Sequence, residues 1–210
     1  MALSPQERES LRLAIRRAEA GTSGEIVCVV ARRSDDYFFP AAVCALFFLL
    51  LASLGAAFLL ERWWIAPRLP VFAAAAMLAG LSILGLLKLL PALRLHLTPR
   101  AVRFRAAHAE AVKQFLARNV HVTSARTGVL VFVSLAERYA EVLADSGIDS
   151  RVPENTWAGL IERLTAAAAG GRLGAGLEAA VGEVGAHLAA HFPPGAENPN
   201  ELPDHLVELG

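Results

Sequence analysis

Two long runs without a charged residue constrain this chain more than any other feature. Residues 38–60 read FFPAAVCALFFLLLASLGAAFLL and residues 69–87 read LPVFAAAAMLAGLSILGLL. A helix rises about 1.5 Å per residue, so the first run extends about 34 Å, enough to cross a hydrocarbon core of about 30 Å. Trp63 and Trp64, in the connector, suit a membrane–water interface. The alternative, two buried helices in a soluble core, is less consistent with runs of this length that carry no polar stripe. The sequence therefore predicts a transmembrane helical hairpin over residues 38–90.

Basic residues are unevenly placed around the two predicted spans. The connector between the spans holds only Arg62 and Arg68, whereas Arg32 and Arg33 precede the first span. After the second span, five basic residues come before the next acidic residue: Lys88, Arg94, Arg100, Arg103 and Arg105. By the positive-inside rule, we expect both termini and the globular part of the chain on the cytoplasmic side of a bacterial inner membrane. Near an anionic leaflet each basic residue contributes about 1 kcal/mol, so we expect these five to lie at the membrane surface.

The N-terminal segment, residues 1–37, has the pattern of a helix followed by a buried strand. Ser4 is a good N-cap, Pro5 suits the first helical position, and Glu7 completes a capping box. This opening is polar and amphipathic, so no cleaved secretory signal is expected. The segment EIVCVVA (Glu25–Ala31) is typical of a strand covered on both faces. A lone helix and strand cannot bury their apolar surfaces, so they need partners elsewhere in the chain.

The expected partners follow the hairpin, in residues 98–192. A helix beginning at Thr98 or Pro99 should bury the stripe Val102, Ala106, Ala109, Val112, Phe115 and Leu116. GVLVFVSL (Gly128–Leu135) repeats the buried-strand pattern, whereas Glu137–Asp145 is ambiguous between helix and strand. Two further amphipathic helices are marked by Trp157, Leu160, Ile161 and Leu164, and by Leu173, Leu177, Val181, Val184 and Leu188. Residues 193–210 are expected to form a loop-like tail. This order predicts one α/β domain, built from residues 1–37 and 98–192 and interrupted by the hairpin.

The composition excludes some classes of function. Lys and Arg number 20 and Asp and Glu number 20, so the formal net charge is zero, whereas a nucleic-acid-binding domain normally carries a basic excess. The cysteines are Cys28, in the predicted strand, and Cys44, inside the first span, which argues against a disulfide framework. We therefore expect a membrane protein that binds no nucleic acid.

Two segments, GEIVCVVARRSDDY (residues 24–37) and RTGVLVFVSLAERYAEVLADSGI (residues 126–148), resemble the TPM-domain family. The founders of that family include a thylakoid-lumen protein, a photosystem-repair protein and a modulator of acetylcholine receptors. The resemblance covers residues 3–37 and 98–192. It is closer still to a bacterial subgroup with two spans inserted after the first strand and an NELPD tail, here Asn200–Asp204. It implies an α/β/α sandwich with a small mixed sheet, and a strand rather than a helix at Tyr139–Asp145.

The resemblance also bears on activity. Some members of the family act as acid phosphatases or calcium binders, and others assist the assembly or repair of membrane complexes. This chain departs from the family pattern in two places. Arg126-Thr127 stands where an acidic residue usually precedes the glycine-led strand, and Asp145–Asp149 replaces a glycine-rich stretch. A metal site or a phosphatase activity therefore does not follow from the resemblance alone.

The best acidic constellation in the sequence consists of Asp145, Asp149 and Glu154. The turn DSGID can present two carboxylates to a hard cation such as Ca²⁺ or Mg²⁺, which binds several oxygen ligands. Glu25 joins this cluster if its strand begins beside the turn. The spacing is not that of an EF-hand. In the alternative interpretation the turn is solvated, and Asp145 caps the segment that follows it.

Three functions remain open from the sequence. The first is a non-enzymatic inner-membrane protein that binds a membrane-protein partner or helps to assemble a membrane complex. It is favoured because no motif for a catalytic serine or a nucleotide phosphate is recognisable. The second is a divalent-metal-dependent phosphatase that uses Asp145, Asp149 and Glu25. The third is a structural membrane scaffold without a specific partner.

Overall fold

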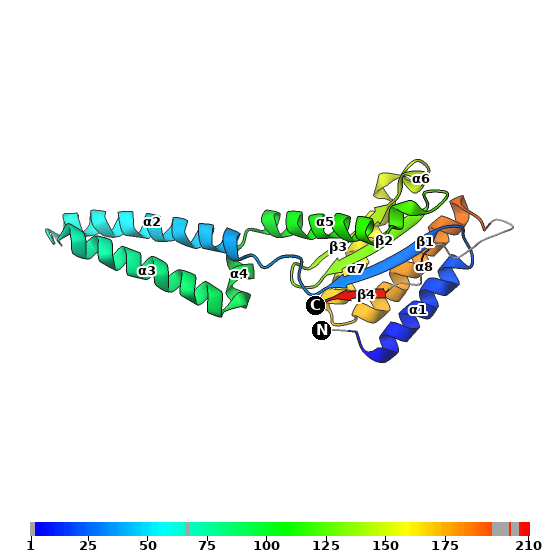
Figure 1. Ribbon diagram of the computed structural model, residues 1–210, viewed down its shortest axis with the longest axis horizontal. Helices are drawn as coiled ribbons and strands as arrows, with labels where there is room; N and C mark the ends of the chain where they lie inside the picture. Colours follow the sequence, from blue (N-terminus) through cyan, green and yellow to red (C-terminus); the bar gives the residue numbers. More distant parts are fainter. Residues whose placement is uncertain (1–2, 66–67, 195–201, 203–205) are drawn as a thin grey trace. The chain divides into compact units, whose positions relative to one another are not determined.

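The computed structural model describes residues 3–65, 68–194, 202 and 206–210 (Figure 1). The chain divides into two compact units. The α/β unit consists of Met1–Ser34 and Phe104–Gly210, and the hairpin unit consists of Asp35–Arg103. The α/β unit is therefore assembled from two chain segments that flank the hairpin unit in the sequence.

A mixed four-stranded sheet forms the centre of the α/β unit. Its strands, in spatial order, are β3 (Tyr139–Ala144), β2 (Gly128–Ser134), β1 (Glu25–Ala31) and β4 (Leu206–Leu209). β1 is parallel to β2 and to β4, and β2 is antiparallel to β3. Every residue of β1 and β2 is buried, as expected for strands covered on both faces. The prediction of a small mixed sheet is confirmed, and the ambiguous segment after β2 is a strand.

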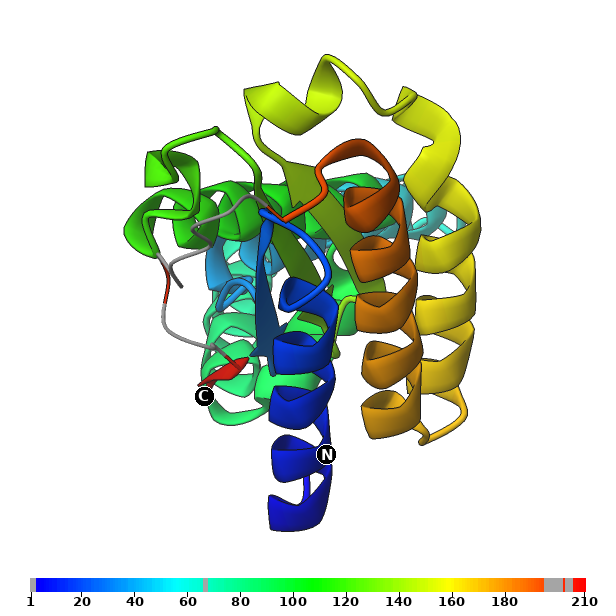
Figure 2. The ribbon, with the colours of Figure 1, turned by 90° about the vertical axis from the view of Figure 1, so that its right-hand side faces the viewer.

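Three helices cover one face of the sheet. α1 (Pro5–Glu19), α8 (Leu173–His191) and α7 (Ala158–Ala169) lie side by side in that order (Figure 2). All five residues of the predicted α8 stripe are buried, and they belong to the same core as Ile26 and Val30 of β1. Burying one such leucine or valine side chain contributes about 1.5–3 kcal/mol. This face therefore holds the larger part of the hydrophobic core.

The first helix begins as the sequence predicts. The Ser4 hydroxyl accepts a hydrogen bond from the Glu7 backbone N–H, and the Glu7 carboxylate accepts one from the Ser4 backbone N–H at 2.8 Å. Leu11 and Ile15, one turn apart, face the core. The capping box therefore sets where α1 starts, and the apolar spacing sets which side of it is buried.

The other face of the sheet is covered by α5 (Arg100–Ala117). Ala107 and Ala111 are fully buried in one core with Phe132 of β2. The predicted stripe of this helix is wrong at Ala109 and Leu116, which are exposed. Small alanine side chains let the helix approach the sheet closely, so close packing, not hydrophobic volume, selects the buried side.

Three short helical elements complete the α/β unit: η1 (Val120–Val122), α6 (Ser146–Asp149) and η2 (Glu154–Trp157). The prediction of a loop-like tail is wrong at Leu206–Leu209, which form β4 alongside β1. A strand of four residues takes its hydrogen bonds from its neighbour, so its own sequence carries little signal. The NELPD segment, Asn200–Asp204, lies outside the described residues except for Leu202.

Three helices lie wholly within the described residues of the hairpin unit. α2 (Phe38–Arg62) and α3 (Leu69–Leu89) pack against each other, and α4 (Pro91–Leu97) contacts both. Both long helices are confirmed over the predicted spans. The sequence analysis does not predict α4, which begins directly after α3 because Pro91 suits a first helical position.

Candidate functional site

The two ends of the sheet carry different polar groups. At the end where β1 and β2 begin and β3 finishes, here called the amino end, Glu25 lies in register with Gly128. The Asp145 backbone N–H donates to the Gly128 carbonyl oxygen at 2.9 Å. Side chains alternate along a strand, so Glu25, Gly128 and Asp145 share the face that α5 covers. The two carboxylate residues therefore lie on either side of Gly128.

The Val120 carbonyl group occupies the space over Gly128. A Cβ atom on Gly128 would lie 2.1 Å from the Val120 oxygen, so only glycine lets η1 rest on the start of β2. Glu25 and Asp145 are both buried, with 7% and 3% of their surface exposed. The amino end of the sheet is therefore a packed polar cluster.

Arg126 supplies the positive charge beside Asp145. Its Nη2 atom lies 2.9 Å from Oδ1 of Asp145, and its Nη1 atom donates to the His121 carbonyl oxygen at 2.9 Å. Oδ1 of Asp145 also accepts a hydrogen bond from the Ser146 backbone N–H at 2.7 Å and so caps α6. Oδ2 of Asp145 is buried and has no hydrogen-bond partner among the described residues. The interpretation of Asp145 as a cap is confirmed.

The other predicted metal ligands are distributed over separate elements. Asp149 is exposed at the end of α6, and Glu154 lies in η2 with its side chain outside the described part of the chain. Glu25 does reach the same end of the sheet as Asp145, separated from it by β2. Within the described residues, no three His, Cys, Asp or Glu side chains are placed to hold a metal ion. A Ca²⁺ or Mg²⁺ site at these four residues therefore stays a prediction.

His121 lies beside this polar cluster. Its Nδ1 atom is buried and has no hydrogen-bond partner in the described part of the chain, and its ring lies 6.3 Å from that of Phe115.

The Thr127 backbone N–H donates to the Thr123 hydroxyl at 2.9 Å, and the Thr127 hydroxyl donates to the Ser23 carbonyl oxygen at 3.0 Å. These bonds fasten the loop before β2 to the segment before β1.

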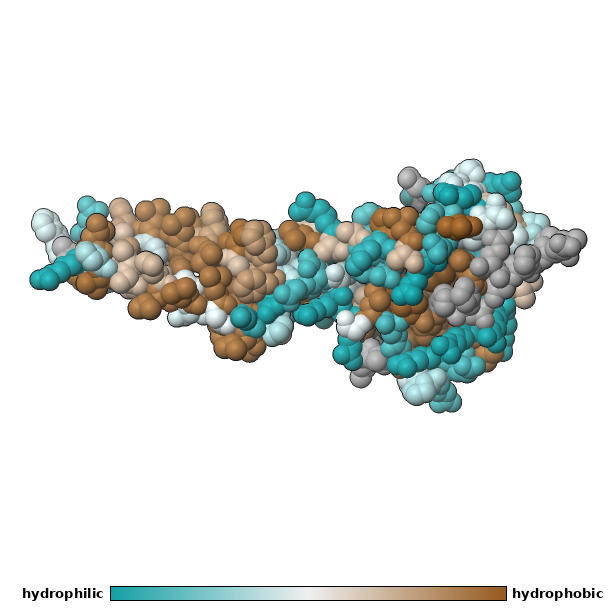
Figure 3. All heavy atoms as spheres, viewed as in Figure 1, coloured by the Kyte–Doolittle hydropathy of each residue, from teal (hydrophilic) through white to brown (hydrophobic). Residues whose placement is uncertain are grey.

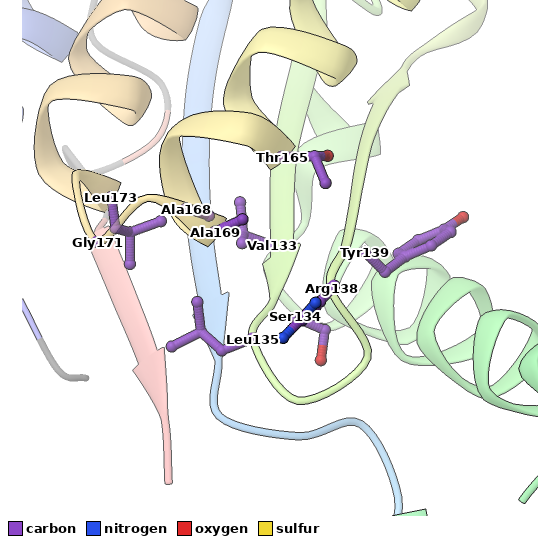
Figure 4. Close-up of a pocket in the computed structure, with 10 residues that line it drawn as sticks. All are labelled: Val133, Ser134, Leu135, Arg138, Tyr139, Thr165, Ala168, Ala169, Gly171 and Leu173. Atoms are coloured by element: carbon purple, nitrogen blue, oxygen red, sulfur yellow. The ribbon is translucent and has the colours of Figure 1, made fainter. Parts of the chain in front are cut away.

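A pocket opens at the opposite, carboxyl end of the sheet (Figure 4). Its volume is about 320 Å³. Its lining comes from the end of β2, the β2–β3 turn, the start of β3, α7, the turn after α7 and the start of α8: Val133, Ser134, Leu135, Arg138, Tyr139, Thr165, Ala168, Ala169, Gly171 and Leu173. Open α/β sheets commonly bind ligands at the carboxyl ends of their parallel strands, and β1 and β2 both finish at this end. Sequence patterns miss the pocket, because its lining comes from separate segments.

A buried carboxylate holds the β2–β3 turn beside the pocket. Glu137 is 3% exposed, and it accepts hydrogen bonds from the Ser134 hydroxyl and, at 3.1 Å, from the Ser34 backbone N–H. The Ser34 hydroxyl donates to the Ser134 hydroxyl oxygen at 2.9 Å. Buried polar groups are normally satisfied in this way. The sequence signal that could have predicted this arrangement is a serine at the end of an apolar strand, followed three residues later by a glutamate.

Two polar side chains of the pocket differ in their pairing. The Tyr139 hydroxyl donates to Oε2 of Glu141 at 2.9 Å, and burial, together with the Glu141 carboxylate, raises the pKa of Tyr139 above its ordinary value. Arg138 is exposed, and its guanidinium has no hydrogen-bond or ion-pair partner among the residues that the structure describes. Its backbone φ is 52°, in the left-handed region. The pocket therefore carries a positive charge that no described side chain neutralises.

Apolar side chains predominate on the face of α2 and α3 that Figure 3 shows, and large apolar side chains of both helices are exposed. Among the described residues, both of these helices are long enough and apolar enough to cross a membrane. Trp63 and Trp64, at the end of α2, are 70% and 93% exposed. Of the basic residues predicted at the membrane surface, Lys88, Arg100 and Arg105 are exposed and Arg103 is half-buried.

Arg94 departs from the prediction for this basic group. Its guanidinium is buried, donates to the carbonyl oxygens of Leu87 at 2.7 Å and Lys88 at 3.0 Å, and pairs with Asp36. It also lies over the ring of Phe38, 5.3 Å from the ring centre. Carbonyl groups at a helix C-terminus lack partners within the helix. Arg94 therefore satisfies the end of α3 and ties it to the start of α2.

Comparisons with known proteins bear on the fold. No family model matches the chain, and no curated protein matches it. The chain is similar to the solved NMR structure of the BA42 protein from the psychrophilic bacterium Bizionia argentinensis. The two share 17% sequence identity, the match covers 99% of this chain and 96% of that one, and the TM-score is 0.61. At this level of identity, the similarity shows a common fold.

Proposed function

We propose that this chain is an integral membrane protein whose hairpin α2–α3 spans the bilayer and anchors the α/β unit. The observation that carries the proposal is the apolar surface of both helices, on which Phe48 of α2 and Leu78 of α3 are 63% and 65% exposed. At about 1.5 Å per residue, the 25 residues of α2 extend about 37 Å and the 21 residues of α3 about 32 Å. Both lengths match a hydrocarbon core of about 30 Å. Lipid is the environment in which such a surface is stable.

In this proposal the α/β unit lies on the cytoplasmic side of a bacterial inner membrane, together with both termini. A hairpin returns the chain to the side from which it entered, so the two segments of the α/β unit can meet there. The placement of basic residues supports the cytoplasmic side. The resemblance to the TPM-domain family supports reading the helix-covered sheet as an α/β/α sandwich.

The proposed role of the anchored unit is that of an auxiliary or assembly factor that binds a membrane-protein partner. The resemblance supports this role, since several members of that family assist membrane complexes. The divalent-metal-dependent phosphatase and the partner-free scaffold are the competing functions. Release of phosphate by the purified chain, lost on Asp145→Asn, would favour the phosphatase.

Cysteine labelling tests the anchoring and its orientation. Cys28 is buried in β1 and Cys44 lies within α2, so the native thiols are shielded in the folded, inserted protein. One added cysteine replaces Trp64 in the connector, and a matched one replaces Glu9, which is exposed on α1. A membrane-impermeant maleimide should label Trp64→Cys in intact cells, and Glu9→Cys only after the membrane is opened. Labelling of Glu9→Cys in intact cells would reverse the orientation, and extraction of the protein by alkaline carbonate would refute the anchoring.

Purification in a mild detergent tests the auxiliary role. The full chain should retain a stoichiometric membrane protein after crosslinking in cells, and the same partner should be recovered in independent preparations. Repeated recovery of the chain alone would contradict the role and favour the scaffold. The labelling experiment remains valid in either case, because it measures only insertion.

A further inference from the structure

The pocket at the carboxyl end of the sheet combines apolar walls with one unneutralised cation. Val133, Leu135, Ala168 and Leu173 supply the apolar walls. Arg138 is the guanidinium at this pocket, and it has no hydrogen-bond or ion-pair partner among the described residues. The neighbouring carboxylate, Glu137, is buried and does not line the pocket. The charge that the pocket offers to a ligand is therefore positive.

The backbone at Arg138 provides a second observation. Its φ of 52° lies in the left-handed region, which non-glycine residues adopt at a cost. Its N–H donates to the Leu135 carbonyl oxygen at 3.3 Å, closing the tight turn between β2 and β3. Strained residues of this kind are concentrated at ligand-binding sites. The turn therefore holds the guanidinium at the pocket even though the backbone conformation is unfavourable.

We propose that this pocket binds an amphipathic anion, in which a carboxylate or phosphate head is attached to a short apolar body. The Arg138 guanidinium binds the oxyanion, since its fork of N–H groups matches two oxygens at once. The apolar walls take the body of the ligand. The volume of about 320 Å³ is near the lower end of the usual range for small-molecule sites, so the bound body is short. Such a ligand has two sources, a soluble organic acid or the head region of an anionic lipid, and the lipid source rests on the proposed membrane anchoring.

The test uses the full chain in nanodiscs of zwitterionic phosphatidylcholine and measures equilibrium binding of hexanoate and hexyl phosphate. Hexylamine has the same apolar body with the opposite charge, and inorganic phosphate has the head without the body. Arg138→Asn removes the charge while keeping a residue that tolerates the left-handed backbone. Ala169→Leu narrows the pocket at an exposed helical position, and Arg12→Gln removes an exposed arginine that does not line it. Thermal unfolding of each variant shows whether it is folded.

Saturable binding of both acids is expected, with much weaker binding of hexylamine and inorganic phosphate. Arg138→Asn should weaken binding about tenfold or more, because a hydrogen bond to a charged group is lost. Ala169→Leu should also weaken it, and Arg12→Gln should leave it unchanged. Equal affinity in folded Arg138→Asn, or no saturable binding at millimolar hexanoate, would overturn the proposal.

A second set of nanodiscs distinguishes the two sources. Replacing part of the phosphatidylcholine by anionic phosphatidylglycerol should weaken hexanoate binding if lipid head groups occupy the pocket, and this competition should disappear in Arg138→Asn. Unchanged hexanoate binding supports a soluble organic acid as the ligand. Failure of the membrane anchoring would appear in the carbonate extraction and labelling experiments, whereas the hexanoate measurement would still report on the pocket.

Discussion

Replacing Arg126 by asparagine removes the charge that accompanies the buried Asp145 carboxylate, together with the hydrogen bond from Arg126 to the His121 carbonyl oxygen. The φ of Arg126 is 57°, and asparagine tolerates this region better than alanine does. The substitution therefore removes the guanidinium without adding backbone strain. It leaves the Ser146 N–H bond to Asp145 in place.

The expected cost follows from the geometry of this ion pair. A hydrogen bond to a charged group contributes about 1.5–3 kcal/mol, and breaking a fully buried pair costs about 3–5 kcal/mol. The Arg126 side chain is 51% exposed while that of Asp145 is 3% exposed, so water screens the pair from one side. We expect the free energy of unfolding to fall by about 2 kcal/mol. For a chain of this length the melting temperature should drop by about 4–8 °C.

Circular dichroism of the full chain in mild detergent, with Asp145→Asn and the double variant, completes a double-mutant cycle. Asparagine keeps the capping role at residue 145, so the cycle isolates the charge pair. We expect a coupling energy of about 1–2 kcal/mol. In Arg126→Asn, millimolar Ca²⁺ or Mg²⁺ should recover part of the lost stability, and wild type should respond less. Additive effects within about 0.5 kcal/mol, or an equal metal response in both proteins, would refute the reasoning.

Three further predictions concern the α/β unit. Gly128→Ala should destabilise the protein by about 3 kcal/mol or more in denaturant titrations, because its Cβ would collide with a backbone carbonyl oxygen of η1; a loss below about 1 kcal/mol would contradict this. Burial raises the pKa of the Cys28 thiol to about 12, so in a Cys44→Ser background maleimide should label it at neutral pH only after unfolding, and rapid labelling of the native protein would disprove it. The Ser4 backbone N–H and hydroxyl lower the pKa of Glu7 below 4.5 in the folded protein. The contribution of the Glu7 carboxylate to the free energy of unfolding is therefore present above pH 4.5 and is lost as the pH falls through the lowered pKa of the folded state. The stability difference between wild type and Glu7→Gln should therefore shrink on acidification, and a difference independent of pH would count against the capping box.

Elements with strong local signals could be predicted from the sequence. The capping box at Ser4 places the start of α1, and a run that is rich in β-branched residues and nearly all apolar places β1 at Glu25–Ala31. Elements that depend on a neighbour could not be predicted in the same way. Leu206–Leu209 becomes a strand because β1 offers an unpaired edge, and the buried side of α5 is chosen by how closely Ala107 and Ala111 approach the sheet.

The candidate site shows the same division. The position of Asp145 in a turn and its role as a cap can both be predicted from the sequence, because both depend on adjacent residues. Its pairing with Arg126 depends on the antiparallel register in which Val129 lies opposite Ala144. The pocket beside Arg138 is lined by segments that are separate in the sequence. Long-range register and the presence or absence of a counter-charge are tertiary properties, so residue spacing does not encode them directly.

Charge pairing at the two ends of the sheet favours anions over cations as ligands of the α/β unit. At the amino end, the most buried carboxylate, Asp145, has an arginine beside it. At the carboxyl end, Glu137 is engaged by two serine residues, while the Arg138 guanidinium has no partner among the described residues. A metal ion at the amino end would compete with Arg126 for Asp145, whereas an oxyanion at the pocket meets a guanidinium with no described competitor. If hexanoate binds through Arg138 and metal ions stabilise only Arg126→Asn, these two results together identify the carboxyl end as the ligand-binding end of the sheet.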